Sequence, residues 1–195
     1  MKNKRNKLDL KCITIYFFIL LFIVSCNKTQ SNNNTYEQCN DTAKAFDLES
    51  LKEQNVSFYE NKKQLNRLRF LLNDGCDDYL REYAGYYLFF SYLIKEKIYN
   101  TVNLDLSHLS KNEREEALLG LRKASMRKDY SECKYILAIF LLNGTYLDKD
   151  TISGINLLES CNDLEQIKLN LLHHRINVHT LDSLYYIPDR FKLNP

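Results

Sequence analysis

The spacing of the apolar residues is the feature that most constrains the fold of this chain. From Asp41 to about Ile187 they recur at intervals of three and four residues, as in Leu65, Leu68 and Leu72. That interval places side chains on one face of an α-helix, and strand-like alternation is hard to find. The 195 residues include only 2 Pro and 5 Gly, too few for the tight turns of a many-stranded sandwich or barrel. The sequence therefore predicts an all-α fold.

The expected helix boundaries follow from this periodicity and from residues that favour helix ends. We expect helices over 41–53, 56–73, 77–97, 111–127, 131–143, 151–161 and 164–178, followed by a looser tail. The candidate N-caps, whose side-chain oxygens can accept the first unpaired amide protons, are Ser110, Asp129 or Ser131, and Asp150 or Thr151. The candidate stops are Asn143-Gly144 and Asp74-Gly75, where a left-handed residue is tolerated.

The N-terminal segment is typical of an export signal. Basic residues precede the uncharged, largely apolar run Ile13–Val24, which is shorter than the ~20 residues of a membrane-spanning helix. The run ends in Ile23-Val24-Ser25-Cys26, which resembles the bacterial lipobox. The resemblance implies that residues 1–25 are a signal peptide and that Cys26 is lipidated as the first mature residue. The alternative is an uncleaved anchor with an incidental cysteine. In lipoproteins Asp after this cysteine favours the inner membrane, so Asn27 favours the outer membrane.

The mature chain differs in charge from the whole sequence. Residues 1–25 contain five basic and one acidic residue, so the remainder carries 22 Lys and Arg against 24 Asp and Glu. Such a balance argues against a nucleic-acid partner, and it leaves membrane attachment to the lipid anchor. The polar segment 26–40 reads as a flexible tether, and residues 41–195 as one helical domain.

The stretch 131–161 carries the most specific pattern in the chain. Its members are Cys133, Tyr135, Leu137, Ala138, Gly144, Asp150, Gly154, Leu157, Leu158 and Cys161. In this order they resemble the Sel-one-like repeat, a cousin of the tetratricopeptide repeat. The resemblance implies two antiparallel helices that pack closely through small residues. We expect Ala138 and Gly154 at that crossing, because only small residues allow the shortest helix separations.

A second, more degenerate unit lies upstream. Ala84, Tyr86 and Leu88 precede Cys133, Tyr135 and Leu137 in the same order, and Ala117, Leu121 and Ala124 belong to the partner helix. Roughly twelve extra residues must then lie between the two helices of this unit, and 97–110 is the obvious place. With half units at 41–73 and 164–178, the fold is expected to be a short right-handed solenoid of antiparallel helix pairs. The alternative is an unrelated helical bundle with a chance match.

The cysteines offer a test of this architecture. Four mature thiols remain besides Cys26, and export makes disulfides expected, although four cysteines allow three connectivities. The resemblance to secreted cysteine-rich Sel-one-like proteins implies a Cys133–Cys161 bridge, which leaves Cys39 with Cys76. No Cys-x-x-Cys or suitable His spacing suggests a metal site, and we expect neither metal nor cofactor.

The candidate functional residues are aromatic rather than catalytic. The clustered histidines His173, His174 and His179 lack the four-residue spacing of a helical metal site, and we identify no catalytic residue. The run 83–92 places aromatic rings all round one helix, so some must be exposed or must fill an unusually bulky core. The preferred partner-binding residues are Tyr83, Tyr87, Tyr99 and Tyr146, whereas Tyr135 belongs to the core.

These features predict a lipoprotein of the outer membrane that faces the periplasm and binds a protein partner. By resemblance, Sel-one-like lipoproteins serve as adaptors and as immunity proteins that occupy periplasmic toxins, and the second role suits a small anchored chain without catalytic groups. One alternative is a structural scaffold for envelope assembly. Another is an enzyme acting on peptidoglycan or β-lactams, as some cysteine-rich Sel-one-like proteins are linked to that chemistry.

Overall fold

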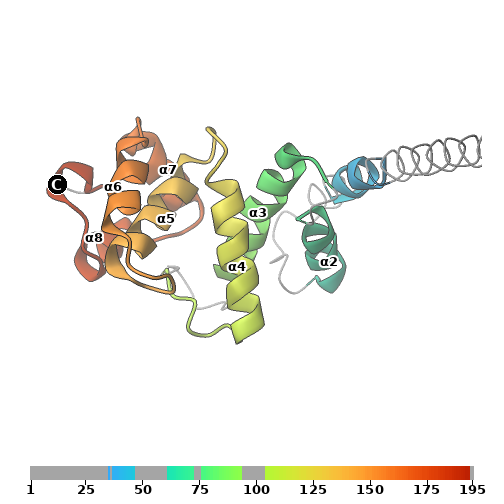
Figure 1. Cartoon of the computed structure of the whole chain (residues 1–195), viewed down its shortest axis with the longest axis horizontal. Coiled ribbons are helices and arrows are strands. Elements are labelled where there is room, and N and C mark those ends of the chain that lie inside the picture. Colours follow the sequence, from blue (N-terminus) through green and yellow to red (C-terminus); the bar gives the residue numbers. More distant parts are fainter. Residues whose placement is uncertain (1–34, 36, 47–60, 73–75, 94–103, 194–195) are drawn as a thin grey trace, which may run out of the picture.

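The computed structural model of the chain describes residues 35, 37–46, 61–72, 76–93 and 104–193 (Figure 1). A first helix spans residues 37–46. The later elements are α2 (Lys62–Leu71), α3 (Asp78–Leu93), α4 (Lys111–Ala124), α5 (Ser131–Asn143), α6 (Thr151–Glu159), α7 (Leu164–His173), α8 (Val178–Leu184) and the 3-10 helix η1 (Asp189–Phe191). These ranges contain helices and no extended strand, which confirms the all-α prediction.

The predicted signal peptide, residues 1–25, and the predicted lipidation site Cys26 lie outside the described ranges. Among the residues that are described, no helix has both the length and the apolar character needed to span a membrane. The end of the predicted tether differs from the prediction, because residues 37–40 already belong to the first helix.

Local sequence signals place several helix ends correctly. Helix α5 has the predicted bounds, and it ends at Gly144, whose φ of 67° is left-handed. Helix α4 begins at the predicted cap Ser110, which forms a reciprocal capping box with Glu113. Asp150 caps α6 by accepting a hydrogen bond from the Ser153 amide. The start of α5 is different, since its N-cap is Tyr130 and no side chain caps it.

The single helix predicted over 164–178 is wrong. Helix α7 ends at His173, and Arg175 takes a left-handed φ of 61° that interrupts the helix. Asn177 then starts α8 by accepting a hydrogen bond from the amide of Thr180. The apolar spacing continues across this break, which is why periodicity alone does not reveal it.

Helices that follow one another in the sequence pack on one another. Helix α2 contacts α3, α3 contacts α4, α4 contacts α5, α5 contacts both α6 and α7, and α7 contacts α8. Figure 1 shows the result as an elongated molecule in which α2 lies towards one end and α8 towards the other. The largest fully buried side chains are Phe46, Phe89, Tyr92, Tyr135 and Phe140, so the core runs through the length of the array and Tyr135 is in it, as predicted.

The close approach predicted for α5 and α6 is confirmed. A Cβ added to Gly154 would lie 2.8 Å from Cγ of Leu142 and 3.2 Å from the carbonyl oxygen of Ala138. Ordinary Cβ contacts are longer, so this crossing favours a glycine in α6, which packs on the backbone of Ala138 and the side chain of Leu142.

One of the two expected disulfides is present. Cys39, in the first helix, is bonded to Cys76, with their Cα atoms 5.7 Å apart. Both residues are buried. The bond ties the first helix to the chain just before α3 and encloses α2 within one covalent loop.

The expected Cys133–Cys161 bridge is not formed, and both residues are buried free thiols. The sulfur of Cys161 lies 3.8 Å from the carbonyl oxygen of Ser131, at the start of α5. Cys133 is two residues beyond Ser131, about 200° around the helix. The Cys133 thiol lies near Tyr86 and Tyr130, since it is among the groups that raise the pKa of both phenols. The pattern therefore brings the two cysteines to neighbouring helix ends, but their side chains leave α5 and α6 in different directions.

Candidate functional site

The strongest candidate for a binding site is a group of half-buried and exposed aromatic side chains around the first turns of α3. We call it the tyrosine surface and define it as Tyr79, Tyr83, Tyr86, Tyr87, Tyr130 and Arg127. Four of its tyrosines lie on α3 at offsets of four, seven and eight residues from Tyr79, which places them along one face of the helix.

The rings of this face touch one another. Tyr83 and Tyr87 have ring centroids 4.8 Å apart, and Tyr86 lies 5.3 Å from Tyr87. The buried ring of Phe46, from the first helix, supports Tyr83 and Tyr87 from below at 6.0 and 5.3 Å. Tyr79 is the most solvent-accessible member, with 59% of its surface exposed. The predicted residues Tyr83 and Tyr87 thus lie together, half-buried, within a larger group.

Arg127 and Tyr130 join this face from the connection between α4 and α5. The guanidinium of Arg127 lies 4.2 Å from the ring centroid of Tyr79 and 4.9 Å from that of Tyr130. Tyr130 stacks on Tyr86 at 4.2 Å. A cation held between two rings, with its planar group partly desolvated, is a favourable arrangement that orders long side chains before any partner arrives.

A buried polar cluster lies behind Tyr86. The Tyr86 hydroxyl forms a hydrogen bond of 2.5 Å with Nε2 of His174, at the end of α7. Glu132 is only 1% exposed and accepts a hydrogen bond of 2.9 Å from the side-chain amide of Asn170. Glu132 lies in the first turn of α5. This cluster joins α3, α5 and α7 and fixes the position of Tyr86.

The electrostatics of the cluster favour neutral groups around that carboxylate. Burial, and then the neighbouring His173, lower the pKa of His174 to about 4, so its imidazole is neutral near pH 7. Burial, and then Glu132, raise the pKa of Tyr86 well above its usual range. Phe90 stacks on the His174 ring at 3.7 Å. Burial also raises the pKa of the Cys133 thiol, and a protonated, enclosed thiol is a poor nucleophile.

Of the other two predicted partner-binding tyrosines, only Tyr146 belongs to the described residues, and it lies away from the tyrosine surface. Tyr99 lies outside the described residues. Tyr146 packs on Phe140, donates a hydrogen bond of 2.6 Å to Asp105, and accepts one of 2.9 Å from the amide of Leu106. Its φ of 62° is left-handed, which fits a side chain held in place by these contacts. Tyr146 therefore anchors the segment before α4, part of the predicted insertion 97–110, to the loop after α5.

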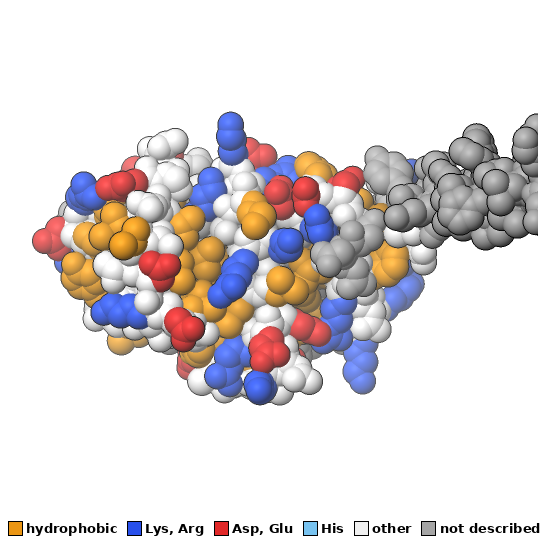
Figure 2. All heavy atoms as spheres, viewed as in Figure 1, with side chains coloured by type: hydrophobic (Ala, Val, Ile, Leu, Met, Phe, Trp, Pro, Cys, Tyr) orange, Lys and Arg blue, Asp and Glu red, His pale blue; other side chains and the backbone are white. Residues whose placement is uncertain are grey.

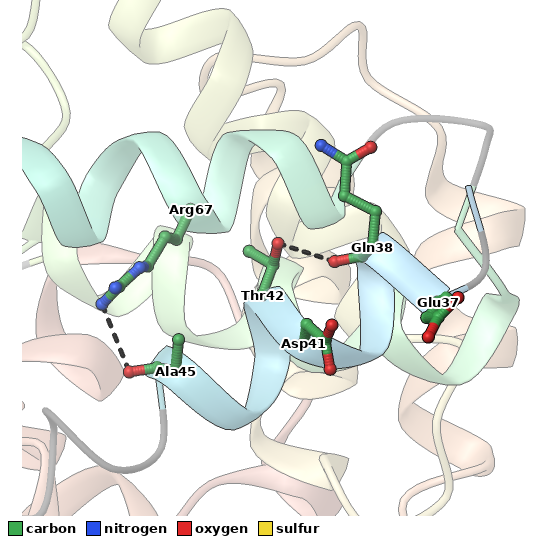
Figure 3. A pocket seen from close by; sticks show the side chains of 6 residues that line it. All are labelled: Glu37, Gln38, Asp41, Thr42, Ala45 and Arg67. Atoms are coloured by element: carbon green, nitrogen blue, oxygen red, sulfur yellow. Dashed lines mark hydrogen bonds between the residues drawn. The ribbon is translucent and has the colours of Figure 1, made fainter. Parts of the chain in front are cut away.

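A hollow of about 490 Å³ lies beside the first helix and α2 (Figure 3). It is lined by Glu37, Gln38, Asp41, Thr42, Ala45 and Arg67. Arg67 donates a hydrogen bond to the carbonyl of Ala45, and the Thr42 hydroxyl donates one to the carbonyl of Gln38 (Figure 3). Arg67 also donates one to the side chain of Gln64. Its cationic and hydroxyl groups are thus engaged with the protein itself. This open hollow offers less to a ligand than the tyrosine surface does.

No cluster of three or more His, Cys, Asp or Glu side chains suited to a metal ion occurs in the parts of the chain that the structure describes. Figure 2 shows acidic and basic side chains interspersed over the face in view. The rings of His173 and His174 have centroids 5.6 Å apart. His174 already forms a hydrogen bond with Tyr86.

Four members of the surface were missed by sequence reasoning, and one of them, Tyr86, was interpreted only as part of the upstream repeat unit. The four-residue spacing of Tyr79, Tyr83 and Tyr87 could have identified Tyr79, which lies just outside the aromatic run considered above. Arg127 and Tyr130 lie in a connection without helical periodicity, so only the fold brings them to α3.

Comparisons with protein-family models, with curated proteins and with solved structures give no match for this chain. The likeness of residues 131–161 to a Sel-one-like repeat therefore stays an interpretation of the sequence pattern.

Proposed function

We propose that this chain is an exported, lipid-anchored protein that binds another protein through its tyrosine surface. The N-terminal pattern that ends at Cys26 supports export and lipidation. The Cys39–Cys76 disulfide supports an oxidising compartment such as the periplasm, because such bonds are rare in the cytosol. The residue after Cys26 is Asn27 rather than Asp, and this favours an anchor in the outer membrane with the domain facing the periplasm.

The observation that carries the binding role is the composition of one continuous surface. Five tyrosines and one arginine contact one another there, and Tyr and Arg are enriched among residues that dominate binding energies. Their mutual contacts hold the rings in place, so binding a partner would cost little side-chain conformational entropy. The phenol and guanidinium edges supply hydrogen bonds at the rim of such an interface.

In its finer form, the proposal describes a right-handed solenoid of Sel-one-like helix pairs that acts as an immunity protein against a periplasmic toxin. The packing of α3 on α4 and of α5 on α6 supports helix pairs as the building unit. The role is binding rather than catalysis, since the polar groups next to the tyrosine surface form an enclosed structural cluster. Neither nucleic acid nor a cofactor is part of this proposal.

The test is affinity capture with the mature domain, in which Cys26→Ser prevents lipidation. We expect one protein from the envelope fraction to co-purify in stoichiometric amount. If it is a toxin encoded by an adjacent gene, co-production should protect cells from it. A gene with no toxin neighbour, together with an envelope defect on deletion, would instead favour the scaffold role. Hydrolysis of wall fragments or β-lactams by the purified domain would contradict the binding role.

A further inference from the structure

Residues 186–193, which follow α8, form a segment that we call the strap. It passes along α5 in the opposite direction, at the end of the molecule away from α2 (Figure 1). At the C-terminal end of α5, the Asn143 side chain accepts a hydrogen bond of 2.7 Å from the Tyr186 amide. The same side chain donates one of 3.1 Å to the Tyr186 carbonyl. Both bonds go to the backbone of the strap.

The other end of the strap is held in the same way. The buried hydroxyl of Tyr135, in the first half of α5, donates a hydrogen bond of 2.9 Å to the carbonyl oxygen of Phe191. Burial raises the pKa of Tyr135, which keeps this hydroxyl protonated and able to donate. Two side chains of one helix therefore bind the main chain of the strap at points five residues apart.

The strap's side chains divide into two sets. Ile187, Phe191 and Leu193 are buried, with 3%, 9% and 2% of their surfaces exposed. Tyr186 points outward and is 66% exposed, and Arg190 forms an ion pair of 2.7 Å with Glu159 at the solvent-exposed edge of α6. Only the three buried apolar side chains distinguish this segment from another peptide. Asn143 and Tyr135 bind its backbone atoms, which every peptide has.

That division is the chemistry of peptide recognition. Side-chain groups that bond main-chain atoms give affinity without regard to sequence, and pockets for selected apolar side chains give specificity. We propose that the face of α5 under the strap is a peptide-binding groove. In the structure the strap of the same chain fills this groove. A segment of a partner protein, with apolar residues at the spacing of Ile187, Phe191 and Leu193, displaces the strap and binds there. This proposal concerns a second site and does not rest on the tyrosine surface.

Few polar bonds hold the strap: those from Asn143 and Tyr135 and an exposed ion pair, and exposed pairs contribute little. The burial of Ile187, Phe191 and Leu193 therefore sets most of the cost of opening. The open strap is a minor state in the wild type, and removing one of these side chains should populate it more. The apparent affinity for a competing peptide falls by the open fraction, so weakening the strap should increase that affinity about tenfold or more.

The experiment uses the full chain and a fluorescent peptide that copies residues 185–194. Phe191→Ala in the protein should increase its affinity for this peptide about tenfold or more over the wild type. Tyr135→Phe in the same background removes one main-chain hydrogen bond from the peptide and from any strap that is still bound, so it should reverse that gain by at most about tenfold. A peptide with polar residues in place of Phe191 and Leu193 is the matched control and should not compete.

A folded Phe191→Ala protein that binds the peptide no better than the wild type would overturn the proposal. Hydrogen exchange on the wild-type chain gives an independent decision if that variant fails to fold. The strap amides should exchange faster than those in the middle of α5, through an opening that leaves α5 protected. Exchange of both segments only through a single global unfolding event would show that the strap is fixed core structure.

Discussion

Gly85 of α3 and Gly120 of α4 face each other where these two helices cross. A Cβ on Gly85 would lie 2.5 Å from the carbonyl oxygen of Gly120, and a Cβ on Gly120 would lie 2.8 Å from that of Gly85. The atoms in the way belong to the backbone, which cannot move aside as a side chain can. The close packing of this helix pair therefore depends on both glycines.

Gly85→Ala should destabilise the protein even though alanine favours helix by about 1 kcal/mol. The methyl group forces the two helices apart, and overpacking costs about 1–3 kcal/mol. Because the clash is with backbone atoms, the cost should lie at the upper end, which leaves a net loss of about 1–2 kcal/mol. Urea unfolding measures the change. Leu119→Ala, at a neighbouring position that is 46% exposed, is the control and should stay within about 0.5 kcal/mol. Equal stability of Gly85→Ala and the wild type would show that the helices do not approach this closely.

The Cys39–Cys76 bond should contribute measurably to stability. It spans 37 residues, and closing loops of this size stabilises by about 2–4 kcal/mol, chiefly by restricting the unfolded chain. A reductant should therefore lower the melting temperature of the wild type and leave that of the Cys39→Ser/Cys76→Ser double variant unchanged. Peptide mapping should also find Cys133 and Cys161 as free thiols. Finding those two residues joined would contradict the side-chain directions described above.

Stability should fall as the pH drops through the titration range of His174. Its pKa is about 4 in the fold and near 6.5 in an unfolded chain. Between these values the unfolded state binds more protons, so the stabilisation is complete above about pH 6.5 and is lost towards pH 4. The upper bound is about 3 kcal/mol.

Other carboxylates titrate in part of this window, so the measurement is a difference. Unfolding free energies of the wild type and of His174→Phe are compared from pH 7 to pH 4. Phenylalanine keeps the stacking on Phe90 but has no proton to gain. The gap between the two proteins should shrink as the pH falls, and a constant gap would show that His174 is not held neutral by the fold.

Lipidation at Cys26 is open to a direct test. Labelling cells with a fatty-acid analogue should mark the wild-type protein and should not mark Cys26→Ser. The wild-type protein should also begin at Cys26, since residues 1–25 are removed. Absence of label from the wild type, together with an intact N-terminal segment, would favour the uncleaved anchor instead.

Local patterns predicted the parts of the fold that local chemistry decides. Helix α5 and its stop at Gly144 follow from apolar spacing and a left-handed glycine. The contact of Gly154 with Ala138 follows from the need for small residues at a crossing. Each of these features depends on residues close together in the sequence.

Contacts between distant residues could not be predicted in the same way. Glu116 of α4 forms an ion pair of 2.9 Å with Arg69 of α2 and accepts a hydrogen bond from the buried Tyr92 of α3. Tyr86 meets His174 across 88 positions of sequence. Such pairs depend on the rotation of each helix about its axis, and an error of one residue changes that angle by about 100°. The misplaced Cys133–Cys161 bridge has the same origin.

The central claim is that the tyrosine surface binds the partner, and calorimetry with the captured protein tests it most directly. Tyr79→Ala and Tyr83→Ala should each weaken the affinity by about tenfold or more, as expected for residues at the centre of an interface. Tyr186→Ala is the matched control, since this side chain is also exposed and only its backbone is hydrogen-bonded. It should change the affinity less than about twofold. Unchanged affinity in the folded Tyr79→Ala and Tyr83→Ala proteins would contradict the account.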